Sequence, residues 1–184
     1  MSELASQRQL RMGFLRWLTV LVPGILLLGV LSGEAGMSGP DSQWFANLVK
    51  PDYTPPPAAF TMVWVLLYIV MGGALALVVA ARGARWRTAA ILAFLGQLLL
   101  NLAWSPLFFA AHRISAALLL LGVLDLAVLA CLVLFLRVRS LAGLLLLPYL
   151  GWLLFATLLN WQFLTLNPDA DGQFDSGAAV RIQL

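Results

Sequence analysis

The stretch YTPPPAAFTMVWVLLYIVMGGALALVVAA, residues 53–81, carries no charged side chain. About 20 consecutive apolar residues allow a helix to cross the hydrocarbon core of a bilayer, so this run is long enough to span a membrane. Four other runs of similar length are uncharged or interrupted only by Asp125. The sequence therefore predicts an all-α, polytopic membrane protein with five transmembrane helices, at about residues 13–32, 58–81, 88–111, 114–136 and 140–165.

The amino-acid composition also favours a bilayer environment. Of the 184 residues, 62% are hydrophobic and 10% are charged, whereas soluble domains carry roughly 25% charged residues. No segment alternates with the period of two that membrane β-strands have. We therefore interpret residues 1–184 as a single membrane domain whose first partner is the lipid bilayer.

Basic residues lie mainly at one end of the predicted bundle. With five spans, the N-terminus shares a side with the loops near residues 82–87 and 137–139, and this side holds eight of the eleven Lys and Arg residues. Cytoplasmic loops are enriched in Lys and Arg, so in a bacterial inner membrane, the expected location, this asymmetry predicts a cytoplasmic N-terminus and an external C-terminus. The net charge of +3 is thus an orientation signal, and we expect no nucleic-acid partner.

The first apolar run has two interpretations. Arg8, Arg11 and Arg16 precede it, as basic residues precede the apolar region of a secretory signal peptide. The run is either a retained transmembrane helix or a cleaved signal.

The long connection at residues 33–57 is rich in Gly, Pro and aromatic residues. Pro restricts the chain to extended and turn conformations, and long ordered loops commonly have a function. We expect this segment, called loop 1, to fold as a lid over one end of the bundle. An interfacial belt of aromatic side chains is the alternative. The polar tail at 168–184 is expected to be disordered.

Polar and aromatic side chains share one face on each of three predicted helices. At 100° per residue, Gln97, Asn101, Trp104 and Phe108 fall within a sector about 60° wide. Either the amides pair across helix interfaces, or they line a small-molecule pocket with aromatic walls. The corresponding faces on the other two helices contain Phe60, Trp64, Tyr68 and Met71, and Tyr149, Trp152, Ala156 and Asn160.

Residues with catalytic or metal-binding chemistry are sparse. Asp125 would cost about 2.5–3.5 kcal/mol to insert, so it should face the bundle or a partner, either with a function or in hydrogen-bonded packing. His112 has no Cys, His or carboxylate at ligand spacing, so no metal site is predicted. Cys131 is the only cysteine and forms no intramolecular disulfide. No nucleophile–base pair is present, and the sequence predicts no catalytic residues of the usual kinds.

Three segments carry the motifs of a known family, in the same order. Residues 44–68 read WFANLVKPDYTPPPAAFTMVWVLLY, residues 97–109 read QLLLNLAWSPLFF, and residues 148–160 read PYLGWLLFATLLN. The chain resembles the TspO/MBR family, which comprises the tryptophan-rich sensory proteins and the translocator proteins, or peripheral-type benzodiazepine receptors. The resemblance covers most of the chain and implies that the first helix is retained.

The resemblance implies a five-helix bundle, commonly a homodimer, with a ligand cavity beneath loop 1. Members of the family bind porphyrins and other tetrapyrroles, so a porphyrin or haem is the expected ligand and no further cofactor is required. The lid residues implied by the motifs are Trp44, Leu48, Lys50 and Pro51. The implied ligand-binding residues are Trp64, Tyr68, Asn101, Trp104, Tyr149, Trp152, Ala156 and Asn160.

The leading hypothesis for function is a membrane receptor for tetrapyrroles with a regulatory or stress-response role. One alternative is light-dependent degradation of porphyrins, which the resemblance associates with Trp64 and Trp152. Another is transport of tetrapyrroles or sterols, although the chain has no internal repeat of the kind common in transporters. A sterol partner is not favoured, because no Lys or Arg follows Asn160 before Arg181, whereas sterol-binding relatives have a basic residue there.

Overall fold

The computed structural model describes residues 7–36 and 42–172 of the chain. In this part of the chain five segments of 24–27 residues are long and apolar enough to cross a membrane, which confirms the predicted all-α membrane fold. The long helices are α1 (Gln7–Ala35), α3 (Pro57–Ala80), α4 (Arg87–Ser105), α5 (Ile114–Val138) and α7 (Leu147–Leu166). The short elements are α2 (Gln43–Asn47), the π-helical turn η2 (Pro106–Ala110), α6 (Ser140–Leu145) and the 3-10 turn η3 (Pro168–Ala170).

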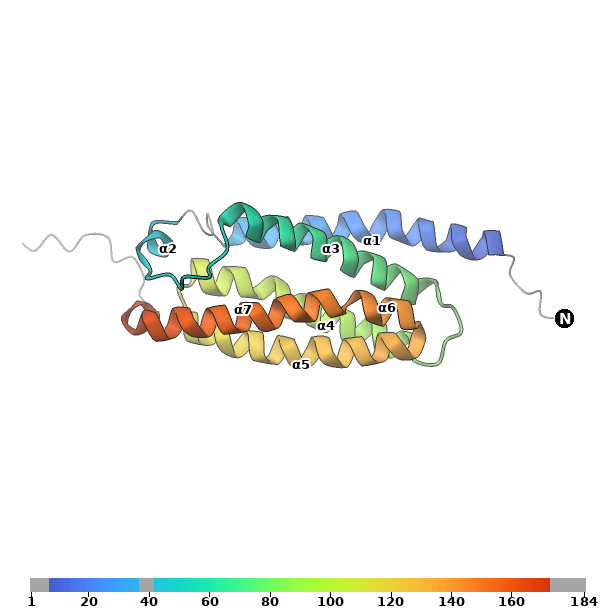
Figure 1. The fold of residues 1–184 in the computed structure, drawn as a ribbon. Helices are drawn as coiled ribbons and strands as arrows, with labels where there is room; N and C mark the ends of the chain where they lie inside the picture. The colour runs from blue at the N-terminus through green and yellow to red at the C-terminus, as the bar shows by residue number, and fades with distance from the viewer. Residues whose placement is uncertain (1–6, 37–41, 173–184) are drawn as a thin grey trace, which may run out of the picture.

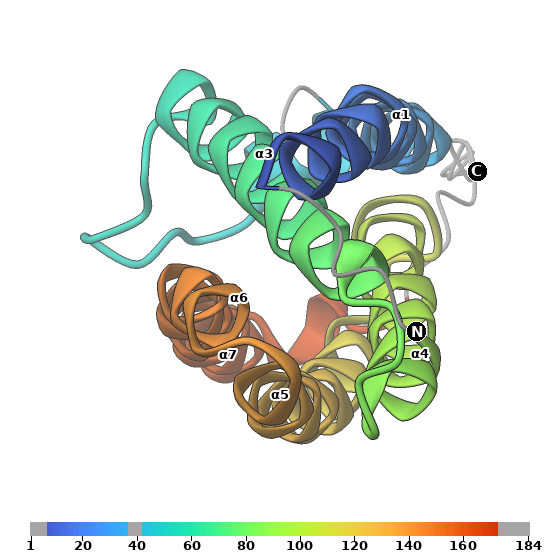
Figure 2. The ribbon, with the colours of Figure 1, turned by 90° about the vertical axis from the view of Figure 1, so that its right-hand side faces the viewer.

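The long helices lie side by side along one axis, and η2 extends α4 while α6 precedes α7 in the same span (Figure 1). Viewed along this axis, α1 lies at the periphery against α3 and α4, and α5 lies between α4 and α7 (Figure 2). α2 lies at the end of the bundle opposite the start of α1 (Figure 1).

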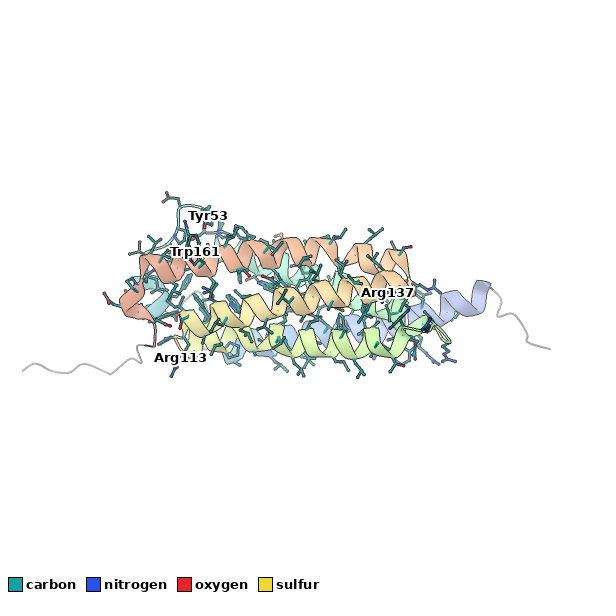
Figure 3. The ribbon with its side chains drawn as sticks, turned by 90° about the horizontal axis from the view of Figure 1, so that it is seen from below. Tyr53, Arg113, Arg137 and Trp161 are labelled. Carbon is teal, nitrogen blue, oxygen red and sulfur yellow. The ribbon has the colours of Figure 1, made fainter. Side chains whose placement is uncertain are left out.

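Basic and aromatic residues mark the two ends of the bundle. Arg137 lies toward the end where α1 begins, whereas Tyr53, Arg113 and Trp161 lie toward the end where α2 is (Figure 3). The guanidinium carbon of Arg137 is 5.1 Å from the centroid of the Trp86 ring, and that of Arg85 is 5.3 Å from it. Cation–π contacts of this kind hold arginines beside an aromatic ring at the level expected for a membrane interface.

Glycines allow α1 to pack directly on α3. A Cβ atom at Gly72 would lie 2.8 Å from Val22 Cγ2 and 2.9 Å from Val22 Cα, so only a glycine permits this approach. A Cβ atom at Gly29 would overlap the ring of Tyr68 in the same way. Small residues at helix interfaces are typical of membrane proteins, because close backbone approach supplies the van der Waals contact that drives association. Gly29 is therefore used for packing within the chain.

α1 is longer than predicted at both ends, and loop 1 contains a short helix. α1 runs from Gln7 to Ala35, whereas the prediction was about residues 13–32, and the helical turn α2 lies within loop 1. The side chain of Ser42 caps this turn by accepting a hydrogen bond from the Phe45 N–H at 3.2 Å. Phe45 then points into a small apolar core, which also contains Leu48, Phe108, Phe109, Ile114, Ala117, Leu159 and Phe163.

The prediction of a disordered tail is wrong for its first residues. Asp171 accepts a hydrogen bond from the Ser115 N–H at 3.1 Å and thereby satisfies a free donor in the first turn of α5. The Gly172 N–H donates to the His112 carbonyl at 2.7 Å. These two bonds order residues 168–172 against the start of α5. The rest of the predicted tail, residues 173–184, lies outside the described part of the chain, as do residues 1–6 and 37–41 of the N-terminus and loop 1.

Candidate ligand-binding site

A chain of buried hydrogen bonds joins α3, α4 and α7 near the middle of the bundle. The Tyr68 hydroxyl donates to Asn101 Oδ1 at 3.0 Å, and Asn101 Nδ2 donates to the Tyr149 hydroxyl at 3.0 Å. The Tyr149 hydroxyl in turn donates to Gln97 Oε1 at 2.8 Å. Gln97 and Asn101 thus act as interhelical links, because amides shielded from water need such partners. The sequence left two interpretations of these amides, pairing across helix interfaces or lining a pocket. The contacts of Gln97 correspond to pairing across a helix interface.

Asn160 forms a second link nearer to loop 1. Its Nδ2 donates to the Ile114 carbonyl at 2.9 Å, and its Oδ1 accepts from the Trp104 indole N–H at 3.4 Å. The amide therefore joins α7 to the start of α5 and orients the indole of Trp104. The Trp104 ring also stacks on Phe108, with centroids 5.4 Å apart and planes at 23°.

Pro106 places the aromatic side chains that follow Trp104. Proline has no N–H and disturbs regular α-helical bonding, and the next turn is a π-helix closed by the Ala111 N–H bonding to the Pro106 carbonyl at 2.9 Å. Phe108 and Phe109 in this turn are both buried. Their rings are 4.9 Å apart and meet at 74°, so the π-helical turn presents a wall of two aromatic rings beside Trp104.

A cavity of about 350 Å³ lies beneath the described part of loop 1, and we call it the lid cavity. Loop 1 contributes Lys50, Pro51 and the run from Thr54 to Pro57, and the helices contribute mainly aromatic residues. The lining residues are Phe45, Lys50, Pro51, Thr54, Pro55, Pro56, Pro57, Phe60, Trp104, Phe108, Phe109, Ala156, Leu159, Asn160 and Phe163.

A second cavity, of about 390 Å³, lies between α1, α3 and α4, and we call it the lateral cavity. It is more polar than the lid cavity, with Ser32, Thr61 and Ser105 in its walls. Its full lining is Leu26, Gly29, Val30, Ser32, Gly33, Glu34, Phe60, Thr61, Trp64, Val65, Tyr68, Asn101, Trp104, Ser105 and Phe109. Phe60, Trp104 and Phe109 line both cavities.

The eight ligand-binding residues predicted from the motifs are distributed over both cavities. Ala156 and Asn160 line the lid cavity, Trp64, Tyr68 and Asn101 line the lateral cavity, and Trp104 lines both. Tyr149 is fully buried in the hydrogen-bonded chain and lines neither of these two cavities. Trp152 also lies outside both linings, but its ring centroid is 5.9 Å from that of Phe60.

The four predicted lid residues occupy different positions. Lys50 and Pro51 line the lid cavity, and Lys50 Nζ lies 5.1 Å from the centroid of the Phe45 ring. Leu48 is buried in the small core. Trp44 stacks on His112, with ring centroids 4.4 Å apart and planes at 12°.

Several lining residues were not predicted as ligand-binding residues. Phe163 is three residues after Asn160 and seven after Ala156, so helical spacing could have placed it on the same face. Phe109 could not be found in this way, because the π-helical turn changes the angle between successive residues. Phe45 lies in loop 1, outside the long helices to which helical spacing was applied.

Asp125 lies outside both cavities and contacts α7. The Thr157 hydroxyl donates to Asp125 Oδ2 at 2.9 Å, while Oδ1 is buried without a hydrogen-bond partner among the described residues. This geometry corresponds to hydrogen-bonded packing. Within residues 7–36 and 42–172, no three His, Cys, Asp or Glu side chains are grouped closely enough to hold a metal ion.

The fold and the cavities define a class of protein: an integral membrane bundle of five helices, with one aromatic cavity beneath a proline-rich loop and a second cavity between α1, α3 and α4. Comparison with known proteins defines it further. Residues 19–166 match the TspO/MBR family, and the chain belongs to this family. The family resemblance inferred from the three motifs is thereby confirmed.

Similar proteins come from bacteria, archaea and animals. The chain is 38% identical over 149 residues to the tryptophan-rich protein TspO of Chlorobaculum tepidum, with 79% of this chain and 92% of that protein covered. It is 42% identical over 125 residues to the tryptophan-rich protein TspO of Archaeoglobus fulgidus, covering 67% and 80%. It is 38% identical over 136 residues to the human translocator protein, covering 73% and 80%.

Proposed function

We propose that this protein is a membrane receptor that binds porphyrins and related tetrapyrroles beneath loop 1 and has a regulatory or stress-response role. The observation that carries the proposal is the set of aromatic rings around Phe60. Its ring centroid is 6.2 Å from Trp64, 6.3 Å from Trp104 and 5.9 Å from Trp152. A flat, conjugated macrocycle gains contact area by stacking on such rings, and mostly apolar cavities with a few polar groups are typical small-molecule sites.

A polar group at the lid cavity matches the edge of a tetrapyrrole. Lys50 is exposed there, where its ammonium group could pair with a propionate carboxylate.

Titration of the purified protein with protoporphyrin, followed by tryptophan fluorescence, tests the proposal. We expect saturable quenching, and a dissociation constant raised about tenfold by the double change Trp64→Phe and Trp152→Phe, because both rings lie beside Phe60. Trp161→Phe is the matched control, since that ring is 51% exposed and lies in neither cavity. Quenching that does not saturate in the unaltered protein would contradict the proposal.

A second candidate function is the light-dependent breakdown of a bound porphyrin. The observation that favours it is again the grouping of Trp64, Trp104 and Trp152 around one position, since tryptophan rings are oxidisable. The reaction requires light and an external oxidant, dioxygen. Porphyrin loss under illumination should then be faster with the protein than in detergent alone, and should slow when Trp64 and Trp152 are both replaced. Equal rates with and without the protein would exclude this activity.

We further propose a homodimer in a bacterial inner membrane, with the N-terminus cytoplasmic and loop 1 external. The grouping of arginines at the end where α1 begins supports the orientation. Alkaline phosphatase fused after residue 172 should be active, and the same enzyme fused after residue 84 should be inactive. The reverse pattern would contradict the proposed orientation.

The proposed homodimer is tested by light scattering in detergent, which should give a protein mass near twice 20.0 kDa.

A further inference from the structure

The lid cavity and the lateral cavity are adjacent and are separated by side chains. Phe60 of α3 and Trp104 of α4 line both cavities, and their ring centroids are 6.3 Å apart at 38° between planes. Phe109 completes the shared wall and packs edge-on against Trp104 at 5.7 Å. The three residues that the two linings share are therefore all aromatic and come from three elements, α3, α4 and η2.

The three rings are not held equally. Trp104 donates a hydrogen bond to Asn160 and stacks on Phe108, and Phe109 is buried in the small core. Phe60 has no hydrogen-bonding group and is only half-buried, with a cavity on each side of its ring. Its backbone N–H is bonded to the Pro56 carbonyl at 3.0 Å, so the main chain is held, while the ring packs against the rings of Trp64, Trp104 and Trp152 at centroid distances of 5.9–6.3 Å. Phe60 is thus the least anchored member of the wall.

We propose that Phe60 acts as a gate between the two cavities, and that its rotation joins them into one site that accepts a flat tetrapyrrole. This inference rests on the proposed function and assigns Phe60 as a residue that determines ligand size. Each cavity alone, at about 350 or 390 Å³, lies near the lower limit of ligand pockets, about 300–1,000 Å³. The joined volume lies in the upper half of that range, which suits a macrocycle of four linked pyrrole rings.

The joined site also places complementary groups at its two ends. Lys50 lies at the lid cavity and can meet a carboxylate on one edge of the macrocycle. The apolar side chains Leu26, Val30 and Val65 of the lateral cavity can cover the opposite edge. A small bicyclic aromatic ligand fits within one cavity and does not need the gate to open. The gate therefore distinguishes ligands by size, and its effect appears in the association rate, which falls when binding requires a conformational change.

Stopped-flow association of protoporphyrin and of isoquinoline with the full-length protein tests the gate. Phe60→Ala removes the ring, so the protoporphyrin association rate constant should rise about threefold or more. Phe60→Trp enlarges the ring, so the same constant should fall about threefold or more. The isoquinoline association rate should change less than about twofold in both variants. Phe14→Ala, a truncation of a half-buried ring in α1 that lines neither cavity, is the matched control and should leave both rates unchanged.

Two results would overturn the gate. Protoporphyrin rates that are the same in the Phe60 variants and the unaltered protein would show that the ring does not limit entry. Parallel changes for protoporphyrin and isoquinoline would show a general effect on the site. If Phe60→Ala fails to fold, Phe60→Leu keeps the apolar packing with a smaller side chain, and the same comparison applies. Failure of the unaltered protein to bind protoporphyrin saturably would instead remove the proposed function itself.

Discussion

The side-chain amide of Asn167 forms two hydrogen bonds with the backbone of Val49. Its Oδ1 accepts from the Val49 N–H at 2.8 Å, and its Nδ2 donates to the Val49 carbonyl at 2.9 Å. Nδ2 also donates to the Phe163 carbonyl at 2.9 Å, which orients the amide at the end of α7. One residue at the end of the last long helix therefore holds loop 1 in place, next to Lys50 and Pro51 of the lid cavity.

Asn167→Ala should loosen loop 1 and speed ligand release. Two lost hydrogen bonds cost about 1–2 kcal/mol, so the protoporphyrin dissociation rate should rise roughly five- to thirtyfold. The amides of residues 45–50 should also exchange hydrogen faster. Asn47→Ala is the control within the same loop, since among the described residues the Asn47 side chain accepts one exposed hydrogen bond, from Gln43 at 3.2 Å. Equal dissociation rates in both variants would mean that Asn167 does not hold the loop.

Tyr149→Phe should lower the stability of the bundle. The change removes the donor to Gln97 and the acceptor for Asn101, and leaves both buried amides short of a partner. We expect a loss of about 1–2 kcal/mol, or a melting temperature lower by about 2–8 °C in detergent. Tyr53→Phe, which alters a ring that is 46% exposed, should leave the melting temperature unchanged.

Gly72→Ala should separate α1 from α3. The new Cβ would lie 2.9 Å from Val22 Cα, so the backbones must move apart, at a cost of about 1–3 kcal/mol. Gly73→Ala is a matched control one residue away, where the nearest atom to a Cβ is Leu18 Cδ1 at 3.8 Å. Melting temperatures should fall for Gly72→Ala only. Similar values for the two variants would mean that the helices tolerate the extra methyl group.

Lys50→Met should weaken binding of porphyrins that carry free carboxylates. An exposed ion pair contributes about 0.2–1 kcal/mol, so the dissociation constant should rise about two- to fivefold at low salt. The dimethyl ester of the same porphyrin has no negative charge and should bind both proteins equally. Arg113→Met removes another exposed charge at the same end of the bundle and should have no effect. If Lys50→Met weakened binding of the free acid and of the dimethyl ester equally, Lys50 would contribute to binding without pairing its charge with a carboxylate.

The sequence by itself determined the membrane fold and the side chains that face the interior. Residues 58–81 and the other apolar runs are expected to be helices, because in lipid every backbone N–H and C=O of a helix is paired within its own segment. Helical spacing placed Asn101 and Trp104 on one face, and the order and spacing of three motifs were sufficient to indicate the family.

Only the tertiary structure decided which of these side chains meet and how they divide the space between them. Helical spacing gives the face of a residue on its own helix, but neither the rotation of that helix nor its neighbours. Packing joined Asn101 to Tyr68 and Tyr149, and Asn160 to Trp104, because interhelical hydrogen bonds require both partners at about 3 Å. Packing also placed Phe60 between two cavities where the sequence predicted one, since the volume left between helices depends on how their side chains fit together.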